Sequence, residues 1–407
     1  MSRKRYGVPF WLARVPKKLR PVYPQYRRHA EVEVVIVGGG MTGCATAYAF
    51  AAAGVPVALV EAGALGQGAT ASSTGLLMQE PEADYRPLED MYGRRAARRV
   101  WQMSRRAMLE CAATLRRLRV RCSLEPQDAI YFTRDTDQVA VLQRDLATRR
   151  AAGLGATWLT GDRLRAVTGL DGLGGIRTRG NHQVDPYRAC LGLAAAAARR
   201  GASIHESSPV TRIRANRKAI DVTTDGGTFR AERVIVATGG GSSLFKPLNR
   251  HVRTTHTYTV MTPPLGTKIR AELGRRDAML WDTEEPYHYL RWTRDYRILF
   301  GGADQSPIPA RRRENVLIQR TGQLMYELST LYPVISGVQP DHAWDGVITS
   351  TTDGLPFIGP HRNYPRHLFA LGFGGNGLAI GFLAARILLR HHQGQPAKGD
   401  ELVGFGR

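Results

Sequence analysis

The most constraining feature of the sequence is an uncharged run of 27 residues, Val34 to Val60, which is followed by Glu61. Its length would suffice for a membrane-spanning helix, which needs about 20 apolar residues. The pattern changes within the run, however. VVIV is typical of a buried parallel strand, GGGMTG interrupts it, CATAYAFAAAG indicates a small-residue helix ending at Gly54, and VPVALVE indicates a second buried strand. The run therefore predicts strand, turn, helix and strand rather than a membrane span.

The turn in this run has the spacing GxGxxG, formed by Gly38, Gly40 and Gly43, and Glu61 follows 23 residues after the first glycine. The first glycine permits a tight turn, the second lets the backbone approach a pyrophosphate, and the third allows close packing of helix and strand. The helix N-terminus offers free N–H groups to phosphates, and Glu61 can accept hydrogen bonds from a ribose. Because all the parts occur in order, they predict a dinucleotide site in a Rossmann-type α/β domain.

The basic composition does not by itself identify a partner. The formal net charge is +22, and 50 of the 57 basic residues are arginine, since only seven are lysine. One interpretation is binding to nucleic acid or an anionic membrane. The arginines are spread over the whole chain without a recurring basic module, so we expect solvated cations and no nucleic-acid partner. The charge can still attract anionic small molecules.

Cysteine usage and the N-terminal segment bear on the compartment. The four cysteines are scattered without a CxxC pair, which predicts no metal site, no disulfide framework and a reducing compartment such as the cytoplasm. A secretory signal is disfavoured because EVE at 31–33 separates the basic N-terminal segment from the apolar run. Residues 6–28 are punctuated by prolines and contain Trp11, Tyr23 and Tyr26. This segment either lies along the protein surface or forms a disordered tail.

The rest of the chain alternates between helical and strand patterns. Helices are expected within 92–120, 137–153, 184–201 and 311–332. A buried strand again leads into glycines at 234–241 and at 368–377, whereas 250–305 are typical of antiparallel strands. We therefore predict an N-terminal extension (1–30), a discontinuous nucleotide-binding domain (31–80, 150–248 and 335–407) and an inserted substrate domain (81–149 and 249–334).

Seven segments together resemble one superfamily of flavoprotein oxidoreductases, that of D-amino-acid oxidase, glycine oxidase and sarcosine oxidase. Within it the resemblance is closest to the gamma-glutamylputrescine oxidase branch. The segments follow the family's order from about residue 31 to 390: VVIVGGGMTGCATAYAFAAAG, VEAGALGQGATASSTG, VDPYRACLGLAAAAARRGA, VIVATGG, YLRWTRDYRILFGG, TTDGLPFIGP and GFGGNGLAIG. The resemblance implies FAD as cofactor, a Rossmann-type FAD-binding domain of the glutathione-reductase-like kind, and an inserted antiparallel-sheet α+β substrate domain.

The resemblance also implies cofactor contacts on several turns. Glu61 and the glycines of the first turn would hold the ADP half, Val210 would lie beside adenine, and the turn at 374–378 would direct N–H groups and a helix dipole at the flavin. The whole implied set is Gly38, Gly40, Met41, Thr42, Gly43, Glu61, Ala62, Thr70, Ala71, Ser72, Ser73, Val210, Ala237, Thr238, Gly239, Gly374, Gly375, Asn376, Gly377 and Leu378.

Two departures from the family pattern matter for the cofactor. Many relatives have histidine at the position of Asn376, so the role of that side chain stays open. Covalent sarcosine oxidases attach flavin through a cysteine some residues ahead of the segment equivalent to DGLPFIGP. The last cysteine here is Cys190. That bond is therefore excluded, and we expect non-covalent FAD.

For the substrate, the family pattern implies an arginine on the substrate-domain sheet that binds a carboxylate. The matching position is Arg291, whose forked donors suit a planar carboxylate; the alternative is an exposed strand arginine. Tyr258, His288 and Tyr289 fall on the same predicted sheet. Tyr289 and Arg291 share a face of a regular strand, whereas His288 points the opposite way and is expected to be structural. The expected catalytic-site residues are Arg291, Tyr289 and Tyr258, with no general base.

Three functions follow as hypotheses. The first is FAD-dependent oxidation of the C–N bond of an amine or amino acid by hydride transfer to flavin N5. The second is an FAD-dependent dehydrogenase of a hydroxy acid or glycerol phosphate. The third is a basic nucleotide-binding protein that acts on nucleic acid or at a membrane surface. The exact substrate, the electron acceptor and the oligomeric state stay open.

Overall fold

The uncharged run that opens the sequence folds as several separate elements. The computed structural model describes residues 5–241, 243–273 and 278–407. Strand β2 (His29–Val37) leads through the glycine turn into helix α2 (Met41–Ala52), and β3 (Val57–Val60) then lies parallel to β2. The predicted strand, turn, helix and strand are confirmed. Within the described ranges, no helix has both the length and the apolar character needed to cross a membrane.

The smaller of two sheets is built around β2. Its strands follow the order β17–β18–β11–β2–β3–β8, and the β9–β10 hairpin is added to β11. All neighbours from β18 to β8 are parallel. The carboxyl ends of parallel strands reach the same edge, so the turns after β2, β3, β11 and β18 meet there. The further strands are β8 (Ser203–His205), β9 (Val210–Ala215), β10 (Ile220–Thr224), β11 (Gly227–Gly239), β17 (Phe357–His361) and β18 (Tyr364–Leu371).

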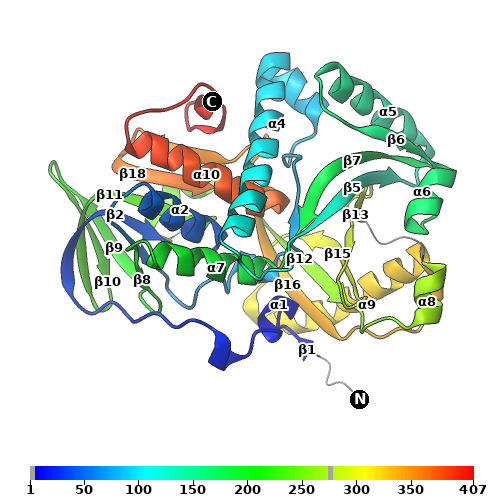
Figure 1. Cartoon of the computed structure of the whole chain (residues 1–407), viewed down its shortest axis with the longest axis horizontal. Helices are drawn as coiled ribbons and strands as arrows, with labels where there is room; N and C mark the ends of the chain where they lie inside the picture. Colours follow the sequence, from blue (N-terminus) through cyan, green and yellow to red (C-terminus); the bar gives the residue numbers. More distant parts are fainter. Residues whose placement is uncertain (1–4, 242, 274–277) are drawn as a thin grey trace.

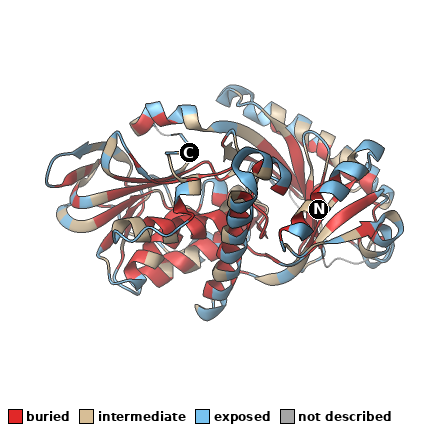
Figure 2. Cartoon of the chain, turned by 90° about the horizontal axis from the view of Figure 1, so that it is seen from above, coloured by how far each residue is buried: buried red, intermediate tan, exposed pale blue. Residues whose placement is uncertain are grey.

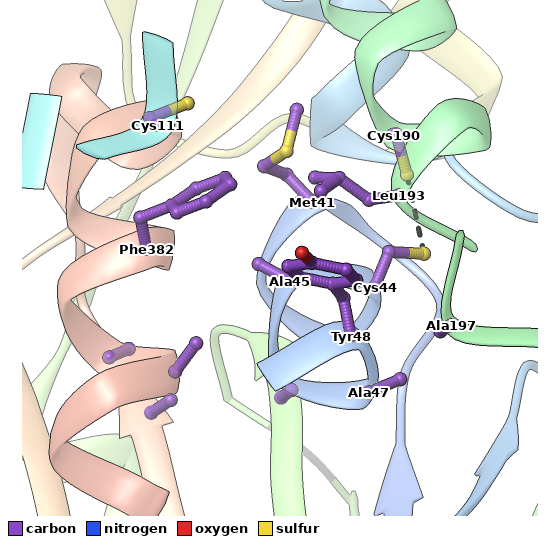
Figure 3. Close-up of a cluster of buried hydrophobic side chains, with 14 of the residues drawn as sticks. Met41, Cys44, Ala45, Ala47, Tyr48, Cys111, Cys190, Leu193, Ala197 and Phe382 are labelled. Carbon is purple, nitrogen blue, oxygen red and sulfur yellow. Dashed lines mark hydrogen bonds between the residues drawn. The ribbon is translucent and has the colours of Figure 1, made fainter. Parts of the chain in front are cut away.

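Helices α2, α7 (Pro186–Ala198) and α10 (Gly377–His392) form the largest core cluster with one face of this sheet. Figure 3 shows how α2 is held between its neighbours: Phe382 of α10 lies on one side, and Cys190 and Leu193 of α7 on the other. The small side chains of α2, such as Ala45 and Ala47, let these helices approach closely. This packing fixes the direction in which the N-terminus of α2 points.

The larger sheet is mainly antiparallel, as predicted for residues 250–305. Its order is β1–β16–β12–β15–β14–β13–β5–β7–β4, with β6 paired to β7. Helix α9 (Arg313–Leu331), with α6 (Gly161–Thr168) and α8 (Thr267–Glu272), covers one face. Its strands are β1 (Arg5–Tyr6), β4 (Leu76–Leu77), β5 (Glu125–Thr133), β6 (Thr157–Thr160), β7 (Gly174–Gln183), β12 (Arg253–Met261), β13 (Ala278–Asp282), β14 (Tyr289–Trp292), β15 (Ile298–Gln305) and β16 (His342–Ser350).

Sheet membership changes the expected domain limits. Strands β6, β7 and β16 fall within 150–248 and 335–407, the ranges expected for the nucleotide-binding domain, yet they pair in the larger sheet. An alternating strand pattern gives a strand's faces but not its partner, because pairing is decided by distant segments. We therefore propose that 157–183 and 342–350 belong to the substrate domain.

Helix α4 (Tyr85–Arg117) stands between the two sheets in Figure 1 and packs against α10, while α5 (Thr136–Ala151) lies over β7. The apolar face of α4, including Met108 and Leu115, joins the core of the smaller sheet, so its arginine-rich outer face is solvated as expected. In Figure 2, buried residues concentrate in the strands of both sheets and on the inner sides of the helices. Each sheet thus has a main core of its own, and α4 contributes its apolar face to that of the smaller sheet.

The described residues of the N-terminal extension contact both sheets, so this segment lies along the protein surface and does not form a disordered tail. Strand β1 pairs with β16, and the side chains of α1 (Phe10–Ala13) are partly buried against the larger sheet. Further along, Tyr26 stacks on Phe229 of β11, with ring centroids 3.7 Å apart. Figure 1 shows this blue segment running along the lower edge of the molecule from β1 to β2.

Candidate cofactor and substrate site

A cavity of about 1230 Å³ opens where the glycine turns of the smaller sheet meet the larger sheet. Small-molecule pockets usually enclose about 300–1,000 Å³, so this one has room for a dinucleotide together with a small substrate. Of the residues implied as cofactor contacts, those that line it are Gly38, Gly40, Met41, Thr42, Glu61, Ala62, Thr70, Ser72, Ser73, Val210, Ala237, Thr238, Gly239, Gly374, Gly375, Asn376, Gly377 and Leu378. The contacts of these residues with a cofactor stay predictions.

The first glycine turn has no room for larger side chains. Gly38 has a φ of +108°, and a Cβ there would lie 2.6 Å from the carbonyl oxygen of Ala237. A Cβ at Gly43 would lie 1.8 Å from the carbonyl oxygen of Gly38. Gly43 is therefore needed for packing of α2 against the turn, and it does not line the cavity. Ala71, the other implied contact that does not line the cavity, is fully buried.

Two long helices begin at this cavity without a side-chain cap in the described chain. Helix α2 starts after Gly40, and α10 starts after the 3₁₀ turn Gly374–Asn376. The first N–H groups of a helix lack partners within the helix and carry the positive end of its dipole. One is already engaged, because Met41 N–H donates to Thr70 Oγ1 at 2.9 Å. The other groups at these two N-termini suit the phosphates and the electron-rich ring of a flavin dinucleotide.

Glu61 lies at the end of β3, where the sequence placed it. Its Oε2 accepts a hydrogen bond from Gly39 N–H at 2.6 Å, and its Oε1 accepts one from Gly63 N–H at 2.9 Å. These bonds hold the carboxylate at the cavity wall beside the glycine turn. A carboxylate has about four acceptor sites, so further acceptance from ribose hydroxyls is compatible with these two bonds.

The loop after α3 (Ala69–Ser72) is held by three donors that are distant in sequence. The carbonyl oxygen of Ser72 accepts from Trp344 Nε1 at 3.0 Å, and that of Ser73 accepts from Trp11 Nε1 at 2.7 Å. The carbonyl oxygen of Thr74 accepts from Arg291 Nη1 at 3.0 Å. We call residues 72–75 the clamped loop. Because it lines the cavity, its position depends on the larger sheet and on the N-terminal extension.

Arg291 lies away from the cavity, contrary to the substrate contact expected from the sequence. Its side chain is buried, and its guanidinium carbon lies 5.2 Å from the centroid of the Trp11 ring. Nη1 also donates to the carbonyl oxygens of Gly75 and Val184 at 2.9 Å each. Burial lowers the pKa of Arg291 to about 9, so the group is still charged at neutral pH. Alternation along the strand correctly placed Tyr289 and Arg291 on the same face of β14. Arg291 lies two residues further along the strand, however, so its side chain contacts the clamped loop and does not line the cavity.

Tyr258, the second residue expected at the substrate, is not among the residues that line the cavity. It points to the opposite face of β12, into the core beneath α9, where its hydroxyl accepts from Gln305 Nε2 at 2.7 Å. Its neighbour Thr257 faces the cavity instead, because adjacent strand residues alternate. The Thr257 hydroxyl lies 2.8 Å from the hydroxyl of Tyr289.

Tyr289 is the one expected catalytic-site residue that lines the cavity. Burial raises its pKa, so the phenol is neutral and can donate or accept a hydrogen bond. His288 points away from the cavity and bonds to Asp282 (Nδ1–Oδ2, 2.8 Å) and to Glu327 (Nε2–Oε2, 3.1 Å). Burial lowers the pKa of His288, but these two carboxylates raise it more, so that the net shift is upward. The structural role expected for His288 agrees with these contacts.

Sequence reasoning missed a group of cavity acids and a second tyrosine. Glu80, Glu82 and Asp304 all line the cavity, as does Tyr287. Glu82 Oε2 accepts from Gly375 N–H at 2.8 Å, so the predicted flavin-facing N–H is bonded to protein in this structure. Asn376 Nδ2 donates to the carbonyl oxygen of Glu80 at 3.0 Å, which gives that side chain a role in holding the acidic segment. The available signal was the group of three acids in MQEPEAD, which follows directly on an apolar run.

Comparison with known proteins agrees with this geometry. Residues 33–390 match the DAO family, described as FAD dependent oxidoreductase. Gamma-glutamylputrescine oxidoreductase of Escherichia coli is 25% identical over 377 residues, covering 92% of this chain and 86% of that protein. Glycine oxidase of Bacillus licheniformis is 25% identical over 390 residues, covering 92% and 96%. The crystal structure of glycine oxidase from Geobacillus kaustophilus superposes with a TM-score of 0.74 at 22% identity and covers 90% and 96% of the two chains.

Proposed function

Because the chain belongs to the DAO family of FAD-dependent oxidoreductases, we propose that it oxidises the carbon–nitrogen bond of an amine or amino acid. The observation that carries this proposal is one cavity that joins the two uncapped helix N-termini to the tyrosines of the larger sheet. The names of the two relatives given above describe enzymes acting on a primary amine derivative and on an amino acid, which supports the same class of substrate. The family membership also argues against the hypothesis of a nucleotide-binding protein without enzymatic activity.

The residues present fit FAD. We expect the N-terminus of α2 and Glu61 to hold the ADP half, and the start of α10 to face the flavin. When bound, FAD supplies the acceptor for a hydride equivalent from the carbon that bears the nitrogen. The positive end of the α10 dipole then favours negative charge at that end of the cavity. The four cysteines are buried within the described structure and none lines the cavity, which supports non-covalent binding.

The protein's own contribution is orientation and exclusion of water. Tyr289 is held flat over Gly301, where a Cβ would lie 2.2 Å from the ring, and its hydroxyl is fixed by Thr257. The rings of Tyr287 and Tyr289, whose centroids are 6.1 Å apart, both line the cavity. A substrate between these rings and the flavin would lose most of its solvent and be held in one orientation.

The test is spectroscopic. The purified protein should show flavin absorption, or regain it with added FAD, and the absorption should bleach anaerobically with amines or amino acids. Bleaching only with hydroxy acids or glycerol phosphate would instead support the second hypothesis, a dehydrogenase of those compounds. A folded protein that cannot take up FAD would contradict both.

A further inference from the structure

The cavity carries a charge opposite to that of the whole chain. The chain has a formal net charge of +22, yet eight carboxylate residues and one cationic residue, Arg149, line the cavity in the described structure. Arg149 is itself paired with Asp145 (Nε–Oδ2, 2.6 Å) and with Asp84 (Nη2–Oδ1, 3.3 Å). No cationic side chain among the described lining residues is therefore available for a substrate carboxylate.

Three of the acids, Glu80, Glu82 and Asp304, form no ion pair among the described residues, although the upward effect of burial on the pKa is partly offset at Glu80 by the charge of Arg149 and at Asp304 by Thr257 and His288. Glu80 is 3% exposed, and both of its carboxylate oxygens are buried without a hydrogen-bond partner. Asp304 Oδ1 is likewise buried without a partner. Glu82 accepts one hydrogen bond, from the backbone N–H of Gly375. Glu82 and Asp304 line the same cavity, burial raises the pKa of all three carboxyl groups, and the charge of Asp304 adds to the upward shift of Glu82.

Aromatic rings surround these acids. A Cβ at Gly375 would lie 3.4 Å from both Glu82 Oε2 and the Tyr287 hydroxyl, so the acid and the ring converge on the turn at the start of α10. Tyr131 and Trp281, which also line the cavity, stack with ring centroids 5.4 Å apart. Rings and carboxylates together bind alkylammonium groups through ion pairing and cation–π contacts.

We propose that the substrate is a di- or polyamine in which a second, non-reacting ammonium group is bound by Glu82 and Asp304. This inference rests on the proposed function and specifies its substrate class. Two further acids, Glu284 and Glu285, are exposed at the rim of the same cavity, so a chain of several cationic groups would meet carboxylates along its length. Glu80 adds a third, buried carboxyl group to the lining of the same cavity.

The reaction balances with the cofactor already named. The reacting amine enters as the neutral form after releasing one proton, and its carbon loses a hydride to FAD, which takes up two electrons. The carbon–nitrogen single bond becomes an imine after loss of the nitrogen's proton, and water hydrolyses the imine to an aldehyde and an amine or ammonia. Oxygen or another two-electron acceptor then reoxidises the cofactor. The distal ammonium group takes no part in these steps and serves only for binding.

The experiment uses the FAD-loaded full chain and three compounds with four carbons each: 1,4-diaminobutane, 1-aminobutane and 4-aminobutanoate. They share a reacting primary amine and differ at the distal group, which is an ammonium, a methyl or a carboxylate. Anaerobic flavin bleaching is followed against concentration. We expect the diamine to half-saturate at a concentration at least tenfold lower than 1-aminobutane, and 4-aminobutanoate to be poorest. Glycine and N-methylglycine are run alongside.

Two variants locate the effect. Glu82→Gln keeps an oxygen that can accept from Gly375 N–H while removing the charge, and Asp304→Asn does the same for the second acid. Each should raise the half-saturating diamine concentration about tenfold to a hundredfold relative to that of 1-aminobutane measured on the same variant. Glu314→Gln, at an exposed position on α9 outside the cavity, is the matched control and should change neither.

A second readout does not depend on turnover. A bis-quaternary diammonium compound has no nitrogen that can become a neutral amine, so it should perturb the flavin spectrum without bleaching, more weakly in Glu82→Gln. Preferential bleaching by 4-aminobutanoate, glycine or N-methylglycine would overturn the inference while leaving the proposed amine oxidation intact. Bleaching by glycerol phosphate or hydroxy acids alone would overturn the proposed function as well.

Discussion

The substitution Arg291→Ala separates a structural role from a substrate-binding role. In the structure, Arg291 Nη1 donates to three carbonyl oxygens, those of Thr74, Gly75 and Val184. The oxygen of Gly75 also accepts from Val184 N–H, so truncation most affects the buried carbonyl of Val184 and the partly buried carbonyl of Thr74. A buried acceptor left unsatisfied costs about 1–3 kcal/mol, so the two together cost about 2–6 kcal/mol.

This loss should be visible as both heat sensitivity and weaker cofactor retention. With an unfolding entropy of about 2.1 cal/mol/K per residue, 2–6 kcal/mol corresponds to a decrease in Tm of roughly 2–7 °C if the chain unfolds as one unit. Because the clamped loop lines the cavity, the variant should also lose FAD more readily on gel filtration. Added FAD should restore bleaching at an unchanged half-saturating substrate concentration, since Arg291 does not line the cavity.

The matched control is Arg253→Ala, which removes an exposed arginine from β12 of the same sheet and should leave Tm and FAD content unchanged. Arg291→Lys retains a cation with fewer fixed donors, so it should lie between the wild type and Arg291→Ala. The reasoning would be refuted by an Arg291→Ala protein with normal Tm and normal FAD content whose half-saturating concentration rises only for substrates bearing a carboxylate. That result would restore the role expected from the sequence.

Three further predictions concern separate parts of the molecule. Gly43→Ala places a methyl group 1.8 Å from a carbonyl oxygen and should give a colourless protein, whereas Gly322→Ala in α9, where a Cβ meets nothing within 4 Å, should keep its colour. Trp11→Phe removes one of the three donors to the clamped loop, the one to Ser73, and should cost about 1–3 kcal/mol in unfolding free energy, measured by urea titration; an unchanged midpoint would show that the bond is dispensable. Burial, and then Arg116, lowers the pKa of His182 to about 4. The unfolded chain, with a pKa of about 6.5, therefore binds the proton first, and stability from this residue is full above pH 6.5 and is lost as the pH falls toward 4. His182→Gln should flatten that part of the stability curve, and an equal slope would count against the assignment.

The parts of the site that the sequence predicted are those encoded locally. The glycine spacing, the flanking β-branched runs and Glu61 are all set within 30 residues, and each is where the pattern predicted. Short-range patterns succeed there because a tight turn and a close helix–strand contact tolerate few alternatives. The same holds for the second glycine turn, at 374–378, which follows directly on a buried strand.

The parts that the sequence missed depend on distant neighbours. Tyr289 and Arg291 were placed on the correct face, but only the packing of the clamped loop decides that the first lines the cavity and the second does not. Tyr258 was expected near the substrate only because it belongs to the same sheet, and the face of the sheet to which its side chain points was not considered. The acids Glu80 and Asp304 lie on different elements, and only the fold brings them to the same cavity. No local pattern contains that information.

Net charge is a further case in which a global property misleads about a site. The excess of arginine led to the expectation that the chain attracts anionic small molecules. At physiological ionic strength, exposed charges are screened over about 8 Å, so arginines on solvated helix faces such as that of α4 act weakly inside the cavity. Buried carboxylates within the cavity are screened much less, and their field decides which group binds there. The distribution of charge over the fold, rather than its sum, therefore favours a cationic substrate for a strongly basic protein.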